Sequence, residues 1–177
     1  MEKFIVKLNI LLKAPLAVFQ NWLYIKRHKV KLNREGLEDL EGKRMPPYAI
    51  ADWLEENIQY VEDGVIDFPQ KPILTFTRRK GDCEDVSRLA AVLLSQLGME
   101  TKIIDIYFKE GKGMSGHSIA VYQALRTHLW GIIGTEGWTE PRYINPEAAV
   151  KRYNWKIICY AVRRQDYSLE RIEEVLV

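Results

Sequence analysis

Cys83 and His117 are the two residues of this sequence whose types and positions could support nucleophilic chemistry. Cys83 lies in "GDCED", directly before an apolar-striped segment, and His117 lies in "GHS", at the start of another apolar segment. A thiol attacks as its thiolate, so it needs a base, and histidine is the base most often used. Of the other histidines, His28 lies in the basic segment "KRHKVK" and His128 near a predicted hairpin turn, where both are expected at the surface. Cys83 and His117 therefore predict a nucleophile–base pair.

The segment that follows Cys83 predicts a long amphipathic helix. One apolar face recurs at helical spacing, formed by Val86, Leu89, Ala90, Leu93, Leu94 and Leu97. Asp82 is a good N-cap and Asp85 resembles the second half of a capping box, which places Cys83 in the first turn. Unpaired backbone N–H groups and the helix dipole favour a thiolate there, whereas the flanking carboxylates raise a thiol pKa. On this pattern alone, a capped helix with a structural cysteine remains an alternative.

The rest of the chain reads as helices followed by strands. A second amphipathic helix is expected over residues 48–60, and residues 61–80 are expected to form a loop because Pro69 and Pro72 discourage regular structure. Strands are predicted at residues 101–108, 117–123, 129–135 and 155–164, and a short helix at residues 168–177. This order favours an α+β domain with an antiparallel sheet.

The ordered set of motifs from about Ile50 to about Thr135 resembles the transglutaminase-like superfamily. "GDCED" opening a helix and "GHS" opening a strand are most similar to the bacterial transglutaminase-like cysteine proteinases. The resemblance implies a papain-like α+β core in which the catalytic helix packs on an antiparallel sheet. It also implies a protein or peptide substrate, whose carbonyl Cys83 would attack to form a thioester while His117 acts as the base. Water would then release the acyl group in a hydrolase, or an amine would accept it in a transglutaminase.

The third residue of the family's site departs from the pattern. The family has an aspartate on the strand after the histidine strand, and this position falls here on Gly134 or Thr135, neither of which is a carboxylate. Glu136 is two residues past Gly134, so it would share its face if the strand continued. We favour Glu136 over Thr135 and Asn145 as the residue that orients His117. The alternative is a catalytically degraded module that acts in binding or scaffolding.

The acidic residues beside Cys83 raise the question of a metal. In some relatives with this motif such acids bind calcium, so the resemblance implies a Ca²⁺ site at Asp82, Glu84 and Asp85, and oxygen-rich ligands suit this ion. A bound cation would reverse the unfavourable effect of the carboxylates on the thiolate. Helix capping explains Asp82 and Asp85 without a metal, and the basic residues 78–80 would supply positive charge instead. No other cofactor is required by the chemistry.

Composition limits the classes of partner. The chain has 177 residues and a formal net charge of +2, which gives no reason to expect a nucleic acid. Cys83 and Cys159 form neither a CxxC motif nor a disulfide framework, so a reducing, cytoplasmic location is expected. Residues 1–44 are expected to form a basic amphipathic arm and linker, and residues 45–177 the catalytic domain.

The arm has three interpretations. Its first 34 residues contain one acidic residue, Glu2, and a basic set of Lys3, Lys7, Lys13, Lys26, Arg27, Lys29, Lys31 and Arg34. The apolar residues between these charges are too interrupted for a normal membrane span. The arm would pack on the main domain, lie as a peripheral helix on an anionic membrane or a partner protein, or serve as a targeting segment.

Overall fold

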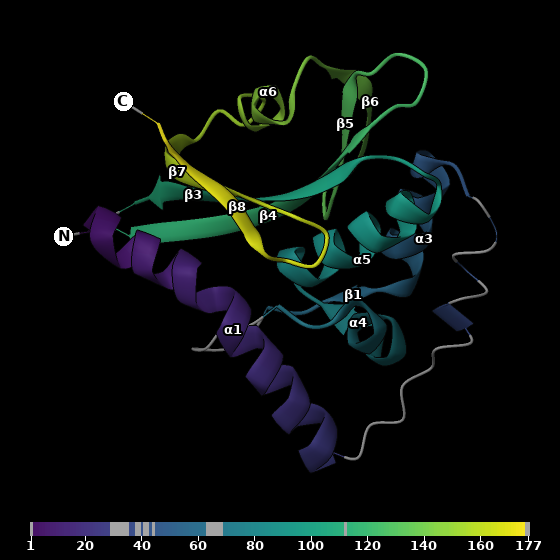
Figure 1. Cartoon of the computed structure of the whole chain (residues 1–177), viewed down its shortest axis with the longest axis horizontal. Helices are drawn as coiled ribbons and strands as arrows, with labels where there is room; N and C mark the ends of the chain where they lie inside the picture. Colours follow the sequence, from purple (N-terminus) through teal and green to yellow (C-terminus); the bar gives the residue numbers. More distant parts are fainter. Residues whose placement is uncertain are drawn as a thin grey trace.

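The computed structural model describes residues 2–28, 36–37, 40, 43, 45–62, 69–111 and 113–175. Its main sheet is six-stranded and antiparallel, in the order β6-β5-β4-β3-β7-β8, and β1 and β2 form a small parallel pair (Figure 1). The helices are α1 (Glu2–His28), α3 (Pro47–Asn57), α4 (Pro72–Arg78), α5 (Cys83–Gln96) and α6 (Pro146–Val150). The strands are β1 (Gln59–Tyr60), β2 (Lys80–Gly81), β3 (Thr101–Glu110), β4 (Gly113–Gln123), β5 (Trp130–Gly134), β6 (Gly137–Tyr143), β7 (Lys156–Arg163) and β8 (Leu169–Glu174). The predicted α+β class is confirmed.

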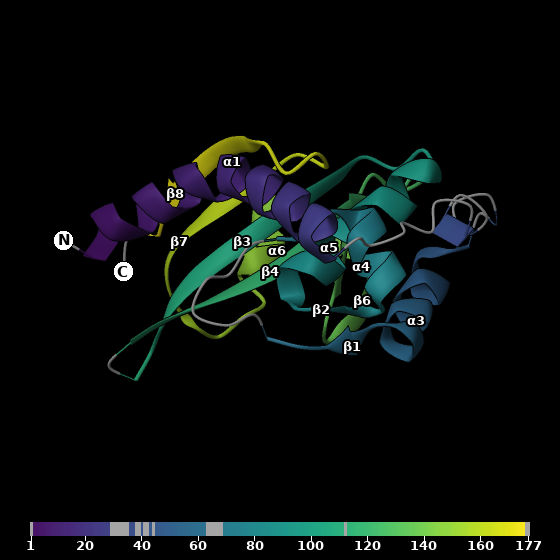
Figure 2. The ribbon, with the colours of Figure 1, turned by 90° about the horizontal axis from the view of Figure 1, so that it is seen from below.

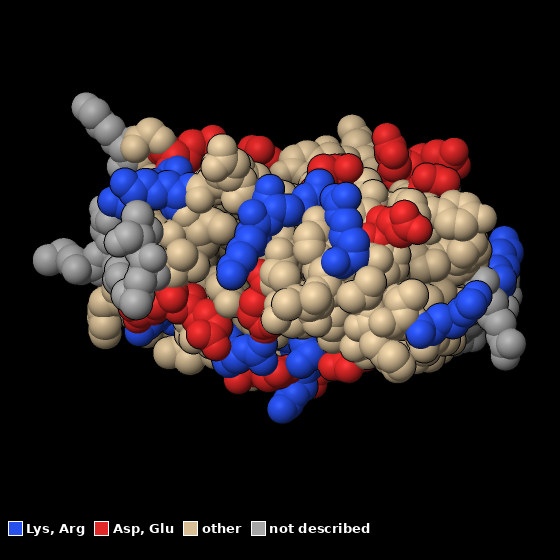
Figure 3. Space-filling model, turned by 90° about the horizontal axis from the view of Figure 1, so that it is seen from above, with Lys and Arg blue, Asp and Glu red and all other residues tan. Residues whose placement is uncertain are grey.

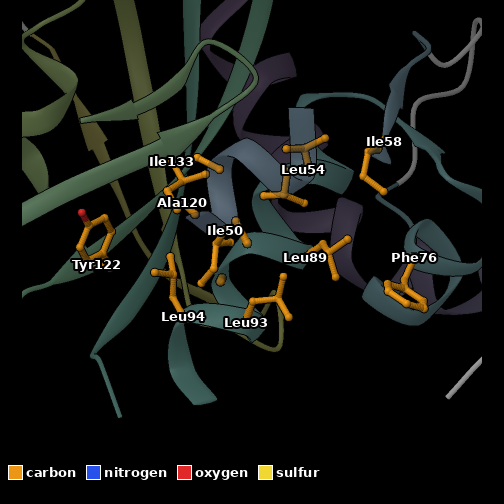
Figure 4. Close-up of a cluster of buried hydrophobic side chains, with 14 of the residues drawn as sticks. Ile50, Leu54, Ile58, Phe76, Leu89, Leu93, Leu94, Ala120, Tyr122 and Ile133 are labelled. Atoms are coloured by element: carbon orange, nitrogen blue, oxygen red, sulfur yellow. The ribbon is translucent and has the colours of Figure 1, made fainter. Parts of the chain in front are cut away.

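Helix α5 is fixed against one face of the sheet by the largest apolar cluster. Figure 4 shows its leucines between α3 on one side and strands β4 and β5 on the other. The side chains of this cluster include Ile50, Leu54, Leu89, Leu93, Leu94, Ala120, Tyr122 and Ile133. Full burial of one leucine side chain stabilises a fold by ~1.5–3 kcal/mol relative to exposure. The cluster therefore holds α5, and with it Cys83, in one position relative to β4.

The opposite face of the sheet is covered by α6. Because side chains alternate along a strand, Ile103 joins the α5 cluster while Ile104 and Ile106 pack with Ala149 and Val150 of α6. The surface around this side carries intermixed basic and acidic side chains, with no continuous basic area in the view of Figure 3. The expectation that nucleic acid is not a partner stays a prediction.

Two segments differ from the sequence-based expectations. The predicted C-terminal helix is wrong, because residues Leu169–Glu174 form strand β8 on the edge of the sheet, paired with β7. A short isolated helix is marginal in water, whereas an edge strand gains hydrogen bonds from β7. The segment expected to be a loop contains helix α4, which starts at Pro72. Proline lacks only an N–H that the first helical position does not use, so it fits there.

Helix α1 lies along the molecule from the β7–β8 edge toward α5 and α4 (Figures 1 and 2). Its inward side buries Val6, Ile10, Lys13, Ala17 and Asn21, which recur every three or four residues. Two of these, Val6 and Ile10, join an apolar cluster with residues of β7. The expectation that the arm packs on the main domain is confirmed for residues 2–28, while the domain boundary at residue 44 stays a prediction. No helix among the described residues is long and apolar enough to cross a membrane.

Candidate active site

Cys83 begins α5, as the sequence predicts. Asp82 caps the helix, with its Oδ1 accepting from the backbone N–H groups of Glu84 at 2.9 Å and Asp85 at 3.2 Å. The thiol of Cys83 is half-buried, whereas the thiol of Cys159 is buried in the apolar cluster beneath α1. A half-buried thiol in the first helical turn can both ionise and meet a substrate.

Cys83 and His117 line the same cavity, which has a volume of about 230 Å³. Helix α1, the first turn of α5 and strands β3 and β4 supply its walls. His117 lies on β4 opposite Ile106 in the antiparallel register with β3. Cys83 and His117 thus both line this cavity, although they come from elements far apart along the chain.

Glu136 contacts the imidazole of His117. Its Oε2 lies 3.1 Å from Nε2 of His117, and its Oε1 accepts a hydrogen bond from the hydroxyl of Tyr153. The expectation that the strand continues through Glu136 is wrong. Glu136 lies in the turn between β5 and β6. With Nε2 held by the carboxylate, Nδ1 is the ring nitrogen left to take a proton from a thiol.

Gly134 makes the room that this carboxylate occupies. A Cβ atom added at Gly134 would overlap Oε2 of Glu136 and would lie 3.0 Å from its Cδ. Since Gly134 does not have a positive φ, its backbone does not require glycine, but a larger residue would displace the carboxylate of Glu136 from its present position. A carboxylate carried by Glu136 therefore fills the volume that a side chain at position 134 would occupy.

The two other candidates for orienting His117 lie elsewhere. Asn145 caps α6, with its Oδ1 accepting from the backbone N–H of Ala148 at 2.7 Å. Thr135 is exposed and lines a different cavity. Among the described hydrogen bonds, neither side chain contacts His117, so Glu136 is the candidate that the geometry supports.

An aromatic group beside His117 was missed by the sequence analysis. The rings of Tyr153 and Trp155 meet the imidazole edge-on, with centroids at 5.7 and 5.5 Å. They stack on each other at 4.3 Å, and Trp155 also stacks on Phe108 at 4.2 Å. These rings restrict the rotation of the imidazole. The segment "RYNW" that supplies them carries no recognisable signal in the sequence.

The environment of Glu136 keeps it ionised. Burial alone would raise the pKa of this carboxyl, but the hydrogen bonds from His117 and Tyr153 and the charge of His117 lower it from 4.5 to about 2. Burial and the neighbouring carboxylate raise the pKa of Tyr153, so its hydroxyl stays protonated and continues to donate. The site thus holds a permanent negative charge behind His117.

The three acids expected to bind calcium have other partners. Both oxygens of Asp85 accept from Gln70, one from its backbone N–H at 2.6 Å and the other from its side-chain amide. Glu84 forms a buried ion pair with Lys13 of α1, and Asp82 caps the helix. Across the described part of the chain, no group of three or more histidine, cysteine, aspartate and glutamate side chains is arranged to hold a metal ion. In this arrangement the three carboxylates are engaged with other groups of the protein, and the expected calcium site stays a prediction.

A second buried charge network lies beneath the cavity. Asp105, which lines the cavity, accepts from Nε of Arg163 at 2.5 Å, from the hydroxyl of Tyr167 at 3.0 Å and from Ser118. Burial would raise the pKa of Asp105, but Arg163, Lys13 and these hydrogen bonds hold it below its ordinary value. Lys13 therefore places a positive charge near both Glu84 and Asp105, which the sequence analysis did not predict.

A larger cavity of about 520 Å³ begins one turn further along α5. Its lining includes Val86, residues 134, 135 and 137 around the Glu136 turn, and mostly apolar residues of α3 and β1. These residues are Ala51, Leu54, Glu55, Ile58, Gln59 and Tyr60. The cavity thus lies against both the helix that carries Cys83 and the turn that carries Glu136.

Comparison with known proteins shows the family and the fold of the chain. The profile of the transglutaminase-like superfamily matches residues 32–155, well over half of the chain. Calcium-bound LapG from Legionella pneumophila is 14% identical with a TM-score of 0.52, covering 78% of this chain and 76% of LapG. EGTA-treated LapG is 14% identical with a TM-score of 0.51, covering 80% and 75%. At this identity the likeness concerns the fold alone, and no curated protein sequence matches the chain. From its matched residues and its fold, the chain belongs to the transglutaminase-like superfamily.

Proposed function

We propose that this protein is a cysteine hydrolase that cleaves a peptide or isopeptide bond. The observation that carries the proposal is the site geometry: Cys83 and His117 line one cavity, and Glu136 holds the Nε2 atom of His117 at 3.1 Å. A carboxylate behind the imidazole fixes its tautomer and stabilises the imidazolium that forms during the reaction. The same contact favours the enzyme interpretation over a degraded binding module.

The proposed reaction proceeds through a thioester. Nδ1 of His117 takes the thiol proton, and the Cys83 sulfur forms a bond to the substrate carbonyl carbon. The resulting oxyanion would face the backbone N–H of Cys83, in the helix turn whose N–H groups lack intrahelical acceptors. His117 returns its proton to the leaving amine as the C–N bond breaks. Water, deprotonated by His117, then hydrolyses the thioester and restores the thiol.

The larger cavity supports an apolar group on the substrate. Leu54, Ile58 and Val86 give it an apolar wall, and Tyr60 stands half-exposed at its edge. Its volume of about 520 Å³ accommodates a large side chain of a peptide. Substrates with an aromatic or aliphatic residue near the cleaved bond are therefore expected to react best.

Alkylation with iodoacetamide tests the proposed site. Cys83 should react faster than free cysteine at neutral pH, because the pair with His117 increases its thiolate fraction. The His117→Ala variant should slow Cys83 to the rate of a free thiol or below it. Cys159, which is buried, is an internal control that should stay unmodified in the folded chain. Equal rates for Cys83 and free cysteine would contradict the proposal.

We propose further that the hydrolase does not require calcium. LapG is solved both calcium-bound and EGTA-treated. Here the Lys13 ammonium supplies a positive charge to Glu84, and a Ca²⁺ ion at the same carboxylate would meet repulsion from it. The alkylation rate of Cys83 and the thermal midpoint should be the same in EGTA and in millimolar calcium chloride. A calcium-dependent rise of either would contradict this part of the proposal.

A further inference from the structure

Helix α1 has an outward side that is almost wholly apolar. We propose that this side is a membrane-binding surface, specific for bilayers that contain anionic lipids. Its exposed large apolar residues are Phe4, Leu8, Leu11, Leu12, Leu16, Val18, Phe19, Trp22 and Leu23. They are between 41% exposed, for Leu23, and 71% exposed, for Phe4. Isolated exposed apolar residues are ordinary, but a continuous row along one helix indicates an interaction surface.

The inward side of α1 is held against the rest of the protein by hydrogen bonds and an ion pair. Asn21 donates to the carbonyl of Pro69 at 3.0 Å and accepts from the backbone N–H of Lys71 at 2.8 Å. Arg163 donates to the carbonyl of Ile10 at 3.0 Å, and Lys13 pairs with Glu84. These contacts fix the rotation of the helix about its axis. The apolar row therefore faces away from the domain and cannot be buried by a rotation of α1.

The shape of the row fits a bilayer surface. From Phe4 to Leu23 it spans about 30 Å at ~1.5 Å per residue, which is long enough for a helix that lies in the interface plane. Near the C-terminal end, Phe19 and Trp22 stack at 6.2 Å, and the ammonium of Lys26 lies 4.8 Å from the centroid of the Trp22 ring. An aromatic ring beside a lysine is typical of a helix at the level of the lipid headgroups, because the ring contacts apolar groups while the ammonium stays in water.

The charges of α1 favour an anionic lipid surface, rather than a second copy of the chain, as the partner of the apolar row. In the sequence, basic residues lie near both ends of α1, Lys3 and Lys7 at one end and Lys26 and Arg27 at the other, and Glu2 is the acidic residue of the helix; of these, Lys7 pairs with Glu174 of β8. Two such helices would bring like charges together in either a parallel or an antiparallel pair. An anionic membrane surface instead attracts each nearby basic residue by ~1 kcal/mol. A lipid surface satisfies both the apolar row and the basic ends.

This surface would place the candidate active site close to the bilayer. Val6, Asn9 and Lys13 of α1 line the cavity that contains Cys83, so one helix diameter, about 10 Å, separates that cavity from the proposed lipid contact. If the proposed function holds, the substrates are peptide segments next to the membrane. The membrane-binding surface itself does not depend on the hydrolase activity, so the two proposals can fail separately.

Vesicle sedimentation tests the surface. The full chain should bind vesicles of equal parts phosphatidylglycerol and phosphatidylcholine, bind pure phosphatidylcholine vesicles much more weakly, and dissociate as salt is raised. The variant Leu12→Glu/Phe19→Glu should bind at least about tenfold more weakly, since two apolar side chains that would enter the bilayer become charged. Both side chains are exposed in the protein, so circular dichroism and the thermal midpoint should be unchanged.

A matched control lies away from α1. Leu125 and Ile144 are 60% and 78% exposed, and the variant Leu125→Glu/Ile144→Glu adds the same negative charge elsewhere on the surface. It should bind vesicles nearly as well as the unaltered chain. Equal loss of binding in both variants would show a net-charge effect only and would overturn the proposal. So would a failure of the unaltered chain to bind, or a dimer in sedimentation analysis that Leu12→Glu/Phe19→Glu dissociates.

Discussion

At the scale of single residues, the carboxylate that contacts His117 comes from Glu136 and occupies the space that a side chain at position 134 would fill. The position at which the resemblance expects an acidic residue falls on Gly134 or Thr135, yet a carboxylate still contacts His117, because Glu136 in the following turn occupies the space beside Gly134. Without a side chain at position 134, nothing blocks this position. If Glu136 replaces the carboxylate of the earlier position, moving the carboxylate back to position 134 should preserve its effect on His117.

The first prediction moves the carboxylate from position 136 to position 134. Glu136→Ala should lower the alkylation rate of Cys83 and any hydrolysis by roughly 100-fold, because His117 loses the group that fixes its tautomer. In Gly134→Asp/Glu136→Ala, the new carboxylate would enter the emptied volume and restore a large part of the rate. Gly134→Asp alone should disturb the site, since two side chains would then compete for one space. Failure of the double variant, with its fold intact, would mean that the position of the carboxylate does not decide the rate.

The second prediction concerns pH and the ionisation of Glu136. The pKa of this carboxyl is lowered from 4.5 to about 2 in the folded protein. Its charge therefore stabilises the fold fully above about pH 4.5, and this contribution is lost as the pH falls toward 2. Urea unfolding should show a difference in free energy between the unaltered chain and Glu136→Gln that is constant near neutral pH and narrows below about pH 4.5. A difference independent of pH would show that the charge of Glu136 contributes nothing.

Residue types alone predicted part of this site. Cys83 and His117 are recognisable because a thiol before a capped helix and a histidine opening a strand are an unusual pair. Tyr153 and Trp155 were not predictable, since their position beside His117 depends on the path of the chain between α6 and β7. Lys13 looked like one of many lysines in a basic segment, and only the docking of α1 places it against Glu84.

At the scale of elements, α1 and α5 are joined by a buried ion pair. The side chains of Lys13 and Glu84 are only 6% and 7% exposed, and Oε2 of Glu84 is buried without a hydrogen-bond partner among the described residues. A buried carboxylate that loses its counter-charge is strongly destabilising, whereas an exposed pair contributes little. The same helix offers both cases, because Lys7 pairs with Glu174 of β8 at 2.5 Å while partly exposed.

The third prediction compares these two lysines. Lys13→Met should lower the free energy of unfolding by ~3–5 kcal/mol, and adding Glu84→Gln should recover part of that loss by removing the unpaired charge. Lys7→Met, the control, should change the free energy of unfolding far less, because this pair is exposed to solvent. The measurement is chemical denaturation followed by tryptophan fluorescence. Equal effects of the two lysine substitutions would contradict a special role for the buried pair.

Element predictions succeeded where the apolar pattern was long and failed where tertiary contacts decided. The helix at α5 and the strands β3, β4, β5 and β7 follow from periodicity within each segment. Strand β8 was predicted as a helix, since Leu169, Ile172 and the surrounding charges suit either structure. Its pairing with β7, the preceding strand, at the sheet edge decided for the strand, and the apolar pattern within residues 169–174 does not reveal this pairing.

At the scale of the whole molecule, the sheet and α1 share one apolar cluster. Val6 and Ile10 cover Ile158, Cys159 and Ala161 on β7, next to the network of Asp105 and Arg163. The family match begins only at residue 32, so it does not include this helix. Two expectations therefore compete: residues 45–177 fold as an independent domain, or the sheet requires α1 to cover its β7 side.

The fourth prediction decides between them by counting reactive thiols. In a Cys83→Ser background, Cys159 is the remaining cysteine, and it is 3% exposed beneath α1. The full-length variant should bind almost no thiol reagent in the native state. Removal of residues 1–28 should expose Cys159 to rapid labelling and lower the thermal midpoint, because Ile158 and Ala161 lose their cover and Glu84 loses Lys13. A truncated chain that keeps Cys159 protected and unfolds at the same temperature would instead make α1 an accessory arm, available in full for binding a membrane.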